Sequence, residues 1–139
     1  DIPIVLLDTI GELACLFQIA SVVFVGGSLV PAGGHNLLEP AVFGKAIIVG
    51  PHMDNFAEIT SQFVAQKAVV QVRDDTEFEI ELVDLVRDRG RRERLGNAAR
   101  ELVESCRGAT KRTMTIAAGL LTPETKNVSD ETVQLSIIP

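Results

Sequence analysis

Short apolar runs rich in valine and isoleucine alternate along the chain with longer segments whose apolar residues recur every three or four positions. The runs predict strands at residues 2–7, 22–25, 46–49 and 68–72. The longer segments predict helices at residues 11–20, 36–43, 54–66 and 76–87, then, after a turn at Gly90, a helix that Gly108 could interrupt before the pattern resumes up to Leu121. Continuous apolar strands separated by helices are typical of a parallel sheet covered on both faces, so the sequence predicts a Rossmann-like α/β fold.

The same periodicity assigns side chains to the buried faces of these helices. Val64 and Val86 are expected to point inward, each beside other apolar residues of its helix. The two cysteines, Cys15 and Cys106, lie in apolar helical patterns without the spacing of a zinc site or a disulfide framework. We therefore expect buried free thiols. Thr9 and Glu12 have the spacing of a capping box at the first helix.

The composition is that of a globular domain. The chain has 139 residues, of which 46% are hydrophobic, and a net charge of −6 that argues against nucleic acid as a partner. Acidic residues dominate 74–86 and basic residues dominate 87–112, and both runs are interpreted as solvated helix faces. No apolar run is long enough for a membrane span, and no signal peptide is visible.

Residues 1–121 are predicted to form one domain, and the polar tail at 122–139 is expected to be poorly ordered. The chain starts at Asp1 rather than at Met, which suggests a piece of a longer protein.

A glycine-rich loop follows the second predicted strand. Gly26-Gly27 and Gly33-Gly34 bracket it, and a predicted helix starts at Asn36. Glycines allow positive φ and a close approach of a ligand to backbone N–H groups, and the start of a helix favours phosphate. Glu39, one turn into the helix, would then be placed to bind a ribose hydroxyl. An ordinary turn closed by an Asn36–Glu39 capping box explains the same residues.

Three loops of the predicted sheet end at one edge. They are residues 8–12, 26–39 and 50–56, which follow successive parallel strands at their carboxyl ends. Ligands of open α/β sheets bind beyond this edge. Their convergence favours the ligand site over a set of unrelated turns.

The motifs of these loops closely resemble one enzyme family. They are Asp8-Thr9-Ile10-Gly11-Glu12-Leu13, Phe24-Val25-Gly26-Gly27-Ser28, Gly33-Gly34-His35-Asn36-Leu37-Leu38-Glu39-Pro40, and Gly50-Pro51-His52 with Asn55-Phe56. In this order and spacing they resemble the carboxyl-terminal half of Kdo transferase, which adds 3-deoxy-D-manno-oct-2-ulosonic acid (Kdo) to lipid A precursor. The resemblance runs from about Ile4 to Leu121.

The resemblance implies the donor half of an inverting glycosyltransferase of the two-domain GT-B type, acting in lipopolysaccharide biosynthesis. The donor is CMP-Kdo, and neither a metal nor another cofactor is implied. The catalytic glutamate, the membrane anchor and the acceptor surface belong to the amino-terminal half of the family. No catalytic residue is therefore assigned here, and this chain alone is expected to be inactive. The complete enzyme would work at the cytoplasmic face of the bacterial inner membrane.

The resemblance also names the positions that contact CMP-Kdo. They are Ile10, Gly11, Glu12, Asn36, Leu37, Leu38 and Glu39, with possible support from Ser28, Gly33, Gly34, His35 and Asn55. Lys45 is the only basic residue among the first 66, so backbone N–H groups would have to hold the phosphate.

Two alternatives remain open from the residues alone. One is a stand-alone nucleotide- or partner-binding module without chemistry. The other is an epimerase of the same GT-B architecture that acts on a nucleotide sugar.

Overall fold

The computed structural model describes residues 4–121 and contains a parallel sheet of three short strands. The strands are β1 (Val22–Phe24), β2 (Ala46–Val49) and β3 (Val70–Gln71), in that order across the sheet. Val22 lies opposite Ala46 and Ile48 opposite Val70, so each strand is parallel to the next. The predicted Rossmann-like α/β arrangement is confirmed.

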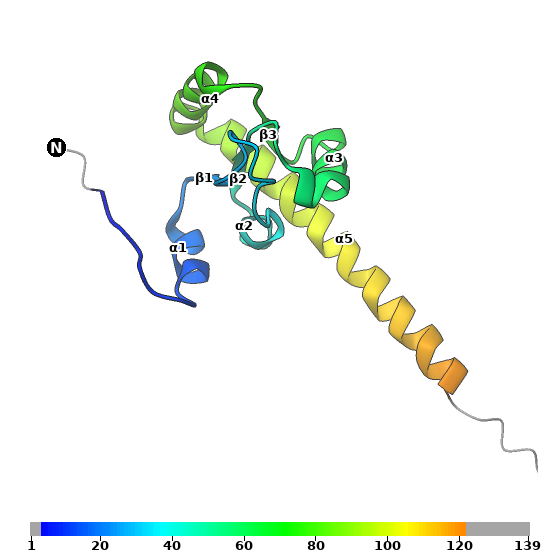
Figure 1. The fold of residues 1–139 in the computed structure, drawn as a ribbon. Coiled ribbons are helices and arrows are strands. Elements are labelled where there is room, and N and C mark those ends of the chain that lie inside the picture. The colour runs from blue at the N-terminus through cyan, green and yellow to red at the C-terminus, as the bar shows by residue number, and fades with distance from the viewer. Residues whose placement is uncertain (1–3, 122–139) are drawn as a thin grey trace, which may run out of the picture.

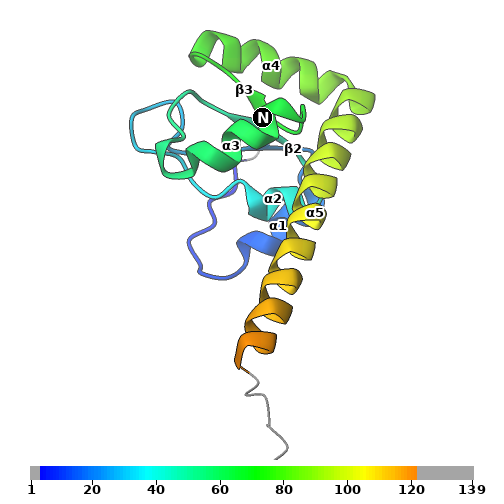
Figure 2. The same ribbon diagram turned by 90° about the vertical axis from the view of Figure 1, so that its right-hand side faces the viewer.

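Helices cover both faces of this sheet (Figures 1 and 2). They are α1 (Leu13–Ile19), α2 (Leu38–Val42), the short 3-10 helix η1 (Asp54–Phe56) continued by α3 (Ala57–Ala65), α4 (Asp75–Arg87) and α5 (Arg89–Leu121). The helix α5 crosses the body of the molecule and extends beyond it.

The central strand β2 is buried on both faces and separates two hydrophobic clusters. Ile47 and Val49 pack in the cluster formed with α2, α3 and α5, whereas Ala46 and Ile48 pack with Leu85 of α4. All four β2 residues are fully buried, as expected of a central parallel strand.

The first predicted strand is absent from the described residues. Residues 4–7 have no regular secondary structure, and the side chains of Ile4, Val5 and Leu6 are 94%, 84% and 85% exposed. A strand forms only when a neighbour satisfies its N–H and C=O groups, and no described strand lies beside this run. The predicted strand is therefore wrong over residues 4–7, because this apolar run has no partner strand among the described residues. Residues 2 and 3 of the predicted strand, and the predicted tail at 122–139, lie outside the described residues.

Several predicted inward side chains are exposed instead. Val64 and Val86 each follow a fully buried neighbour, Phe63 or Leu85, and one residue along a helix turns the side chain by about 100°. Cys15 and Cys106 are free, as expected, but both are exposed rather than buried. In these helices the apolar residues extend around the helix beyond the face that packs against the rest of the molecule.

The last helix is longer and begins earlier than predicted. The predicted turn at Gly90 is wrong because the chain turns at Asp88, whose Oδ1 accepts a 2.8 Å hydrogen bond from the backbone N–H of Arg91. Gly108 does not interrupt α5. Gly96 is where α5 passes the turn between α2 and β2, since a β-carbon there would lie 2.0 Å from the carbonyl oxygen of Gly44. The backbones themselves are therefore in contact at this crossing.

The charged runs partly pair with each other where α4 meets α5. Arg91 Nη2 lies 2.6 Å from Glu81 Oε2, and both side chains are mostly covered. Arg92 Nη1 donates to the carbonyl oxygens of Leu85 and Val86 at the end of α4. The interpretation of both runs as plain solvated faces is thus incomplete.

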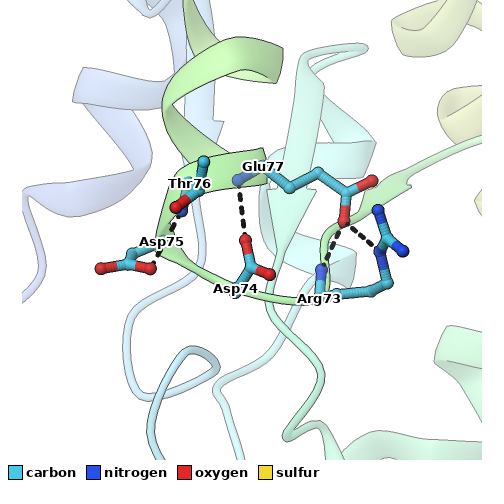
Figure 3. Close-up of polar contacts among 5 residues, drawn as sticks. All are labelled: Arg73, Asp74, Asp75, Thr76 and Glu77. Carbon is cyan, nitrogen blue, oxygen red and sulfur yellow. Dashed lines mark hydrogen bonds and ion pairs between the residues drawn. The ribbon is translucent and has the colours of Figure 1, made fainter.

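The start of α4 is fixed by a local hydrogen-bond network (Figure 3). Asp74 Oδ1 accepts from the backbone N–H of Glu77 at 2.8 Å. Glu77 Oε2 accepts from the backbone N–H and from Nε of Arg73, at 2.8 Å and 2.9 Å. The two hydrogen bonds from Arg73, of which the side-chain bond has the larger effect, lower the pKa of Glu77.

Candidate functional site

The loop after β1 is joined to the loop after β2 through Ser28. The side chain of Ser28 is fully buried. Its Oγ donates to the carbonyl oxygen of Val25 at 2.6 Å and accepts from the backbone N–H of Gly50 at 2.8 Å. The backbone N–H of His52 adds a 2.9 Å bond to the Ser28 carbonyl. Two of the three loops predicted to converge therefore do so, and Ser28 positions them.

Gly33 and Gly34 are needed for the packing of these two loops. Their φ angles are +84° and +69°, a region that other residues rarely adopt. A β-carbon at Gly33 would lie 2.4 Å from Asn55 Nδ2, and one at Gly34 would lie 2.3 Å from Met53 Sδ. The missing side chains thus make room for Asn55 and Met53.

The Asn36–Glu39 pair forms a local turn at the entry to α2. Asn36 Oδ1 accepts from the backbone N–H of Leu38 at 3.0 Å, and Asn36 Nδ2 donates to Glu39 Oε1 at 3.2 Å. This is not a capping box, because the first residue before α2 is Leu37 and no side chain caps it. The helix has only five residues rather than the eight predicted, so its dipole is small. The exposed Glu39 carboxylate is held in place by Asn36.

A groove of about 660 Å³ lies beside β1 and ends at this turn. Its rim is polar, with Gly26, His35, Asn36 and Glu39. Its walls are apolar: Leu13, Leu16, Phe17, Ala20, Val22, Val23, Phe24, Val25, Pro40 and Phe56. An apolar cleft of this size with a few polar groups at one end is typical of a small-molecule site.

The first predicted loop, residues 8–12, supplies none of the residues that line the groove. Ile10 is fully exposed, and nothing lies within 4 Å of a β-carbon built at Gly11. The predicted capping box is also wrong here, because the Thr9 hydroxyl donates to the Glu12 carboxylate and no side chain caps α1. Ile10, Gly11 and Glu12 are thus not among the residues that line the groove, although Leu13, which follows Glu12, is.

The remaining predicted residues divide between core and rim. Leu37 is fully buried and Leu38 packs against the same hydrophobic cluster, so both side chains belong to the core. The His35 ring lies close to the backbone of Gly27, with Nε2 at 3.7 Å from a β-carbon built there. Lys45 Nζ donates to the Gln18 carbonyl at 2.8 Å, so the cation is engaged at the end of α1.

Sequence reasoning missed the apolar wall of the groove. Phe17 and Phe56 contribute to this wall, and periodicity places both on the apolar faces of predicted helices. Periodicity reports which side chains avoid water, but it does not distinguish a packed core from the lining of a cleft. No pattern in the sequence would have separated the two.

Residues 4–121 contain no group of three or more His, Cys, Asp or Glu side chains arranged to hold a metal ion. Within the same residues, no helix combines the length and the apolar character that crossing a membrane requires.

Curated proteins and solved structures are similar to this chain, although no protein-family model matches it. The 3-deoxy-D-manno-octulosonic acid transferase of Haemophilus influenzae is 41% identical over 110 residues, which are 78% of this chain and 26% of that protein. The enzyme of the same name from Bordetella pertussis is 34% identical over 113 residues, 81% of this chain and 26% of that protein.

One of the similar solved structures is the C-terminal CMP-Kdo binding domain of WaaA from Acinetobacter baumannii. It superposes with a TM-score of 0.66 at 34% identity, over 70% of this chain and 51% of that domain. The chain therefore spans about a quarter of the curated relatives and about half of the solved domain.

The three-stranded parallel sheet, its helices and the loops at its carboxyl edge define a Rossmann-like domain of the kind found in the C-terminal half of GT-B glycosyltransferases. The resemblance to the carboxyl-terminal half of Kdo transferase is confirmed.

Proposed function

We propose that this chain is the donor-binding part of an inverting glycosyltransferase that transfers Kdo from CMP-Kdo to lipid A precursor in lipopolysaccharide biosynthesis. The observation that carries the proposal is the groove beside β1 with its polar rim, in a chain that is 34% identical to the CMP-Kdo binding domain of WaaA from Acinetobacter baumannii over 70% of its length. The complete enzyme would act at the cytoplasmic face of the bacterial inner membrane.

The proposed roles follow from the geometry of the rim. Glu39 accepts hydrogen bonds from ribose hydroxyls, because its carboxylate is exposed and Asn36 fixes its orientation. His35 and the backbone N–H groups of the loop lie where a phosphate would enter the groove. The contacts expected of Ile10, Gly11 and Glu12 stay predictions from the resemblance.

The chemistry of transfer is proposed to lie outside this chain. Deprotonating an acceptor hydroxyl requires a general base within direct hydrogen-bonding reach, and the family resemblance places that glutamate in the amino-terminal half. The chain would therefore bind the donor without transferring Kdo, and would need neither a metal nor a cofactor. Kdo transfer by the purified chain alone would contradict this assignment.

The test is a titration of the isolated chain with CMP, UMP and ADP, followed by the chemical shifts of its backbone amides in NMR spectra. This readout detects weak binding and reports where the nucleotide lies. We expect CMP to shift the amides of Gly26, Asn36 and Glu39 more than UMP or ADP does. Equal responses to all three nucleotides, or shifts confined to other parts of the chain, would show that the groove is not a CMP site.

A matched pair of variants tests Glu39 itself. Glu39→Gln keeps an oxygen for Asn36 but loses the charge, so CMP affinity should fall about tenfold, the equivalent of one charge-assisted hydrogen bond. Glu79→Gln, on the exposed surface of α4, removes the same charge from a residue that does not line the groove and should leave affinity unchanged. Both variants should keep the melting temperature of the parent. If Glu39→Gln binds CMP as tightly as Glu79→Gln does, Glu39 only shapes the turn.

A further inference from the structure

Two residues of the groove rim, His35 and Asn36, lie between two buried neighbours in the chain. Both rim residues line the groove, whereas Gly34 before them and Leu37 after them are buried and do not line it. Leu37 is fully buried in the cluster formed with α2, α3 and α5. The position of the two rim residues therefore depends on what holds Gly34 and Leu37 in place.

Two different segments hold Gly34. Its backbone N–H donates to the carbonyl oxygen of Gly27, in the loop after β1, at 3.1 Å. The Met53 side chain, from the loop after β2, lies against it: a β-carbon built at Gly34 would be 2.3 Å from Met53 Sδ and 3.2 Å from Met53 Cε. The last two heavy atoms of the methionine therefore occupy the place where a side chain of residue 34 would be.

Met53 is itself firmly held. It is only 3% exposed and packs in the cluster formed with α2, α3 and α5, where close packing leaves a side chain few other positions. Its carbonyl oxygen accepts from the backbone N–H of Phe56 at 2.9 Å. Further along the same loop, the backbone N–H of Asn55 donates to the carbonyl oxygen of Gly33 at 3.2 Å. Met53 does not line the groove, so it can affect a ligand there only through Gly34.

We propose that Met53 is a positioning residue for the nucleotide site, because its thioether, packed against Gly34, fixes His35 and Asn36 at the rim. The proposal deepens the proposed function and rests on it. Truncating Met53 would leave unfilled space beside Gly34, since a core relaxes only partly around a removed side chain. A glycine next to free space regains backbone freedom, and the two rim residues move with it. Asn36 Nδ2 donates to Glu39 Oε1 at 3.2 Å, so the proposed ribose ligand would lose its fixed orientation as well.

The test compares Met53→Ala with Leu85→Ala in the full chain. Both changes truncate a buried side chain of similar size, and Leu85 packs in the other hydrophobic cluster, with Ala46 and Ile48. The two variants should therefore lose similar amounts of melting temperature. Hydrogen exchange separates them: the Gly34 amide should exchange at least about tenfold faster in Met53→Ala than in Leu85→Ala, because only the first change frees the rim.

The same pair of variants is then titrated with CMP, followed by backbone amide shifts in NMR spectra. A rim that is in its binding arrangement about a tenth of the time binds about tenfold more weakly, so we expect a loss of this size in Met53→Ala. Leu85→Ala should bind CMP as the parent does, because Leu85 does not line the groove and packs on the other face of β2. A loss of affinity without a matching difference in melting temperature is not expected of a purely structural role.

Two further substitutions of Met53 complete the test. Met53→Leu keeps apolar δ atoms against Gly34 and nearly the same volume, so it should restore both the protection of the Gly34 amide and the affinity for CMP. Met53→Val lacks the δ and ε atoms but removes less of the core than alanine does. If circular dichroism shows that Met53→Ala does not fold, Met53→Val and Leu85→Val give the same comparison.

Three outcomes would overturn the proposal. They are equal Gly34 exchange in the Met53 and Leu85 variants, equal CMP affinity of these variants when the parent chain binds CMP, and a Met53→Leu variant as impaired as Met53→Ala in both readouts. Failure of the parent chain to bind CMP, with Gly34 exchange faster only in the Met53 variant, would instead refute the proposed function and leave the positioning of the rim by Met53 intact.

Discussion

Removing the hydroxyl of Ser28 should destabilise the chain far more than its small size suggests. In Ser28→Ala the buried N–H of Gly50 loses the acceptor at 2.8 Å, and the carbonyl of Val25 loses the donor at 2.6 Å. Water cannot replace the hydroxyl without entering the core, because Ser28 is fully buried. An orphaned buried polar group costs about 1–3 kcal/mol, so we expect a loss of about 2 kcal/mol in the free energy of unfolding.

The assay is thermal unfolding followed by far-ultraviolet circular dichroism, since the chain has no tryptophan or tyrosine to report by fluorescence. For a domain of this size, about 2 kcal/mol corresponds to a melting temperature lower by roughly 8 °C. Ser61→Ala is the matched control: its Oγ donates to the Ala57 carbonyl within α3 at 2.9 Å but is exposed, so the change should stay within about 0.5 kcal/mol. Equal melting temperatures for the two variants would refute the role of Ser28 as the link between the loops.

Two further changes probe the scaffold. Gly96→Ala would place a methyl group 2.0 Å from the Gly44 carbonyl oxygen and should lower the free energy of unfolding by at least about 2 kcal/mol. The control Gly90→Ala meets only side-chain atoms and should be neutral or stabilising. Equal melting temperatures for the two variants would contradict the close crossing. Because the pKa of Glu77 is lowered on folding, its bond to Arg73 contributes stability above the unfolded pKa, near 4.5, and loses it as the pH falls through the folded pKa. The difference in melting temperature between the parent and Glu77→Gln should therefore be largest above pH 4.5 and vanish in acid, and a difference independent of pH would show that the ionised carboxylate is not the cause.

The fold was predictable from the local hydrophobic pattern, because β2 and the segments beside it can be recognised from their own residues. Four consecutive apolar residues, closed by Gly50 and preceded by Gly44 at the end of a helix, identify a buried parallel strand without any tertiary information. The apolar run at residues 4–7 carries the same signal, yet it forms no strand here. The difference lies in the partner strand, which no local pattern can report.

The meeting of the loops after β1 and β2 was predictable from the sequence, but the details of their packing were not. The rim loops could be found because glycine, asparagine and glutamate stand at the carboxyl ends of strands. The structural reason for each glycine could not be predicted, because that reason depends on which side chain packs against the glycine in the folded chain. Gly34 looked like an opening for a ligand, but it accommodates the sulfur of Met53, a residue nineteen positions later whose approach only the folded chain shows.

The crossing of Gly96 over Gly44 has a mechanical consequence. Where two backbones touch with no side chain between them, neither can move toward the other, and no rotamer change can absorb a displacement. Gly44 ends the segment that begins with α2, and α2 carries Glu39. A displacement of α5 toward this crossing would therefore displace α2, the helix that carries Glu39, by nearly the same amount.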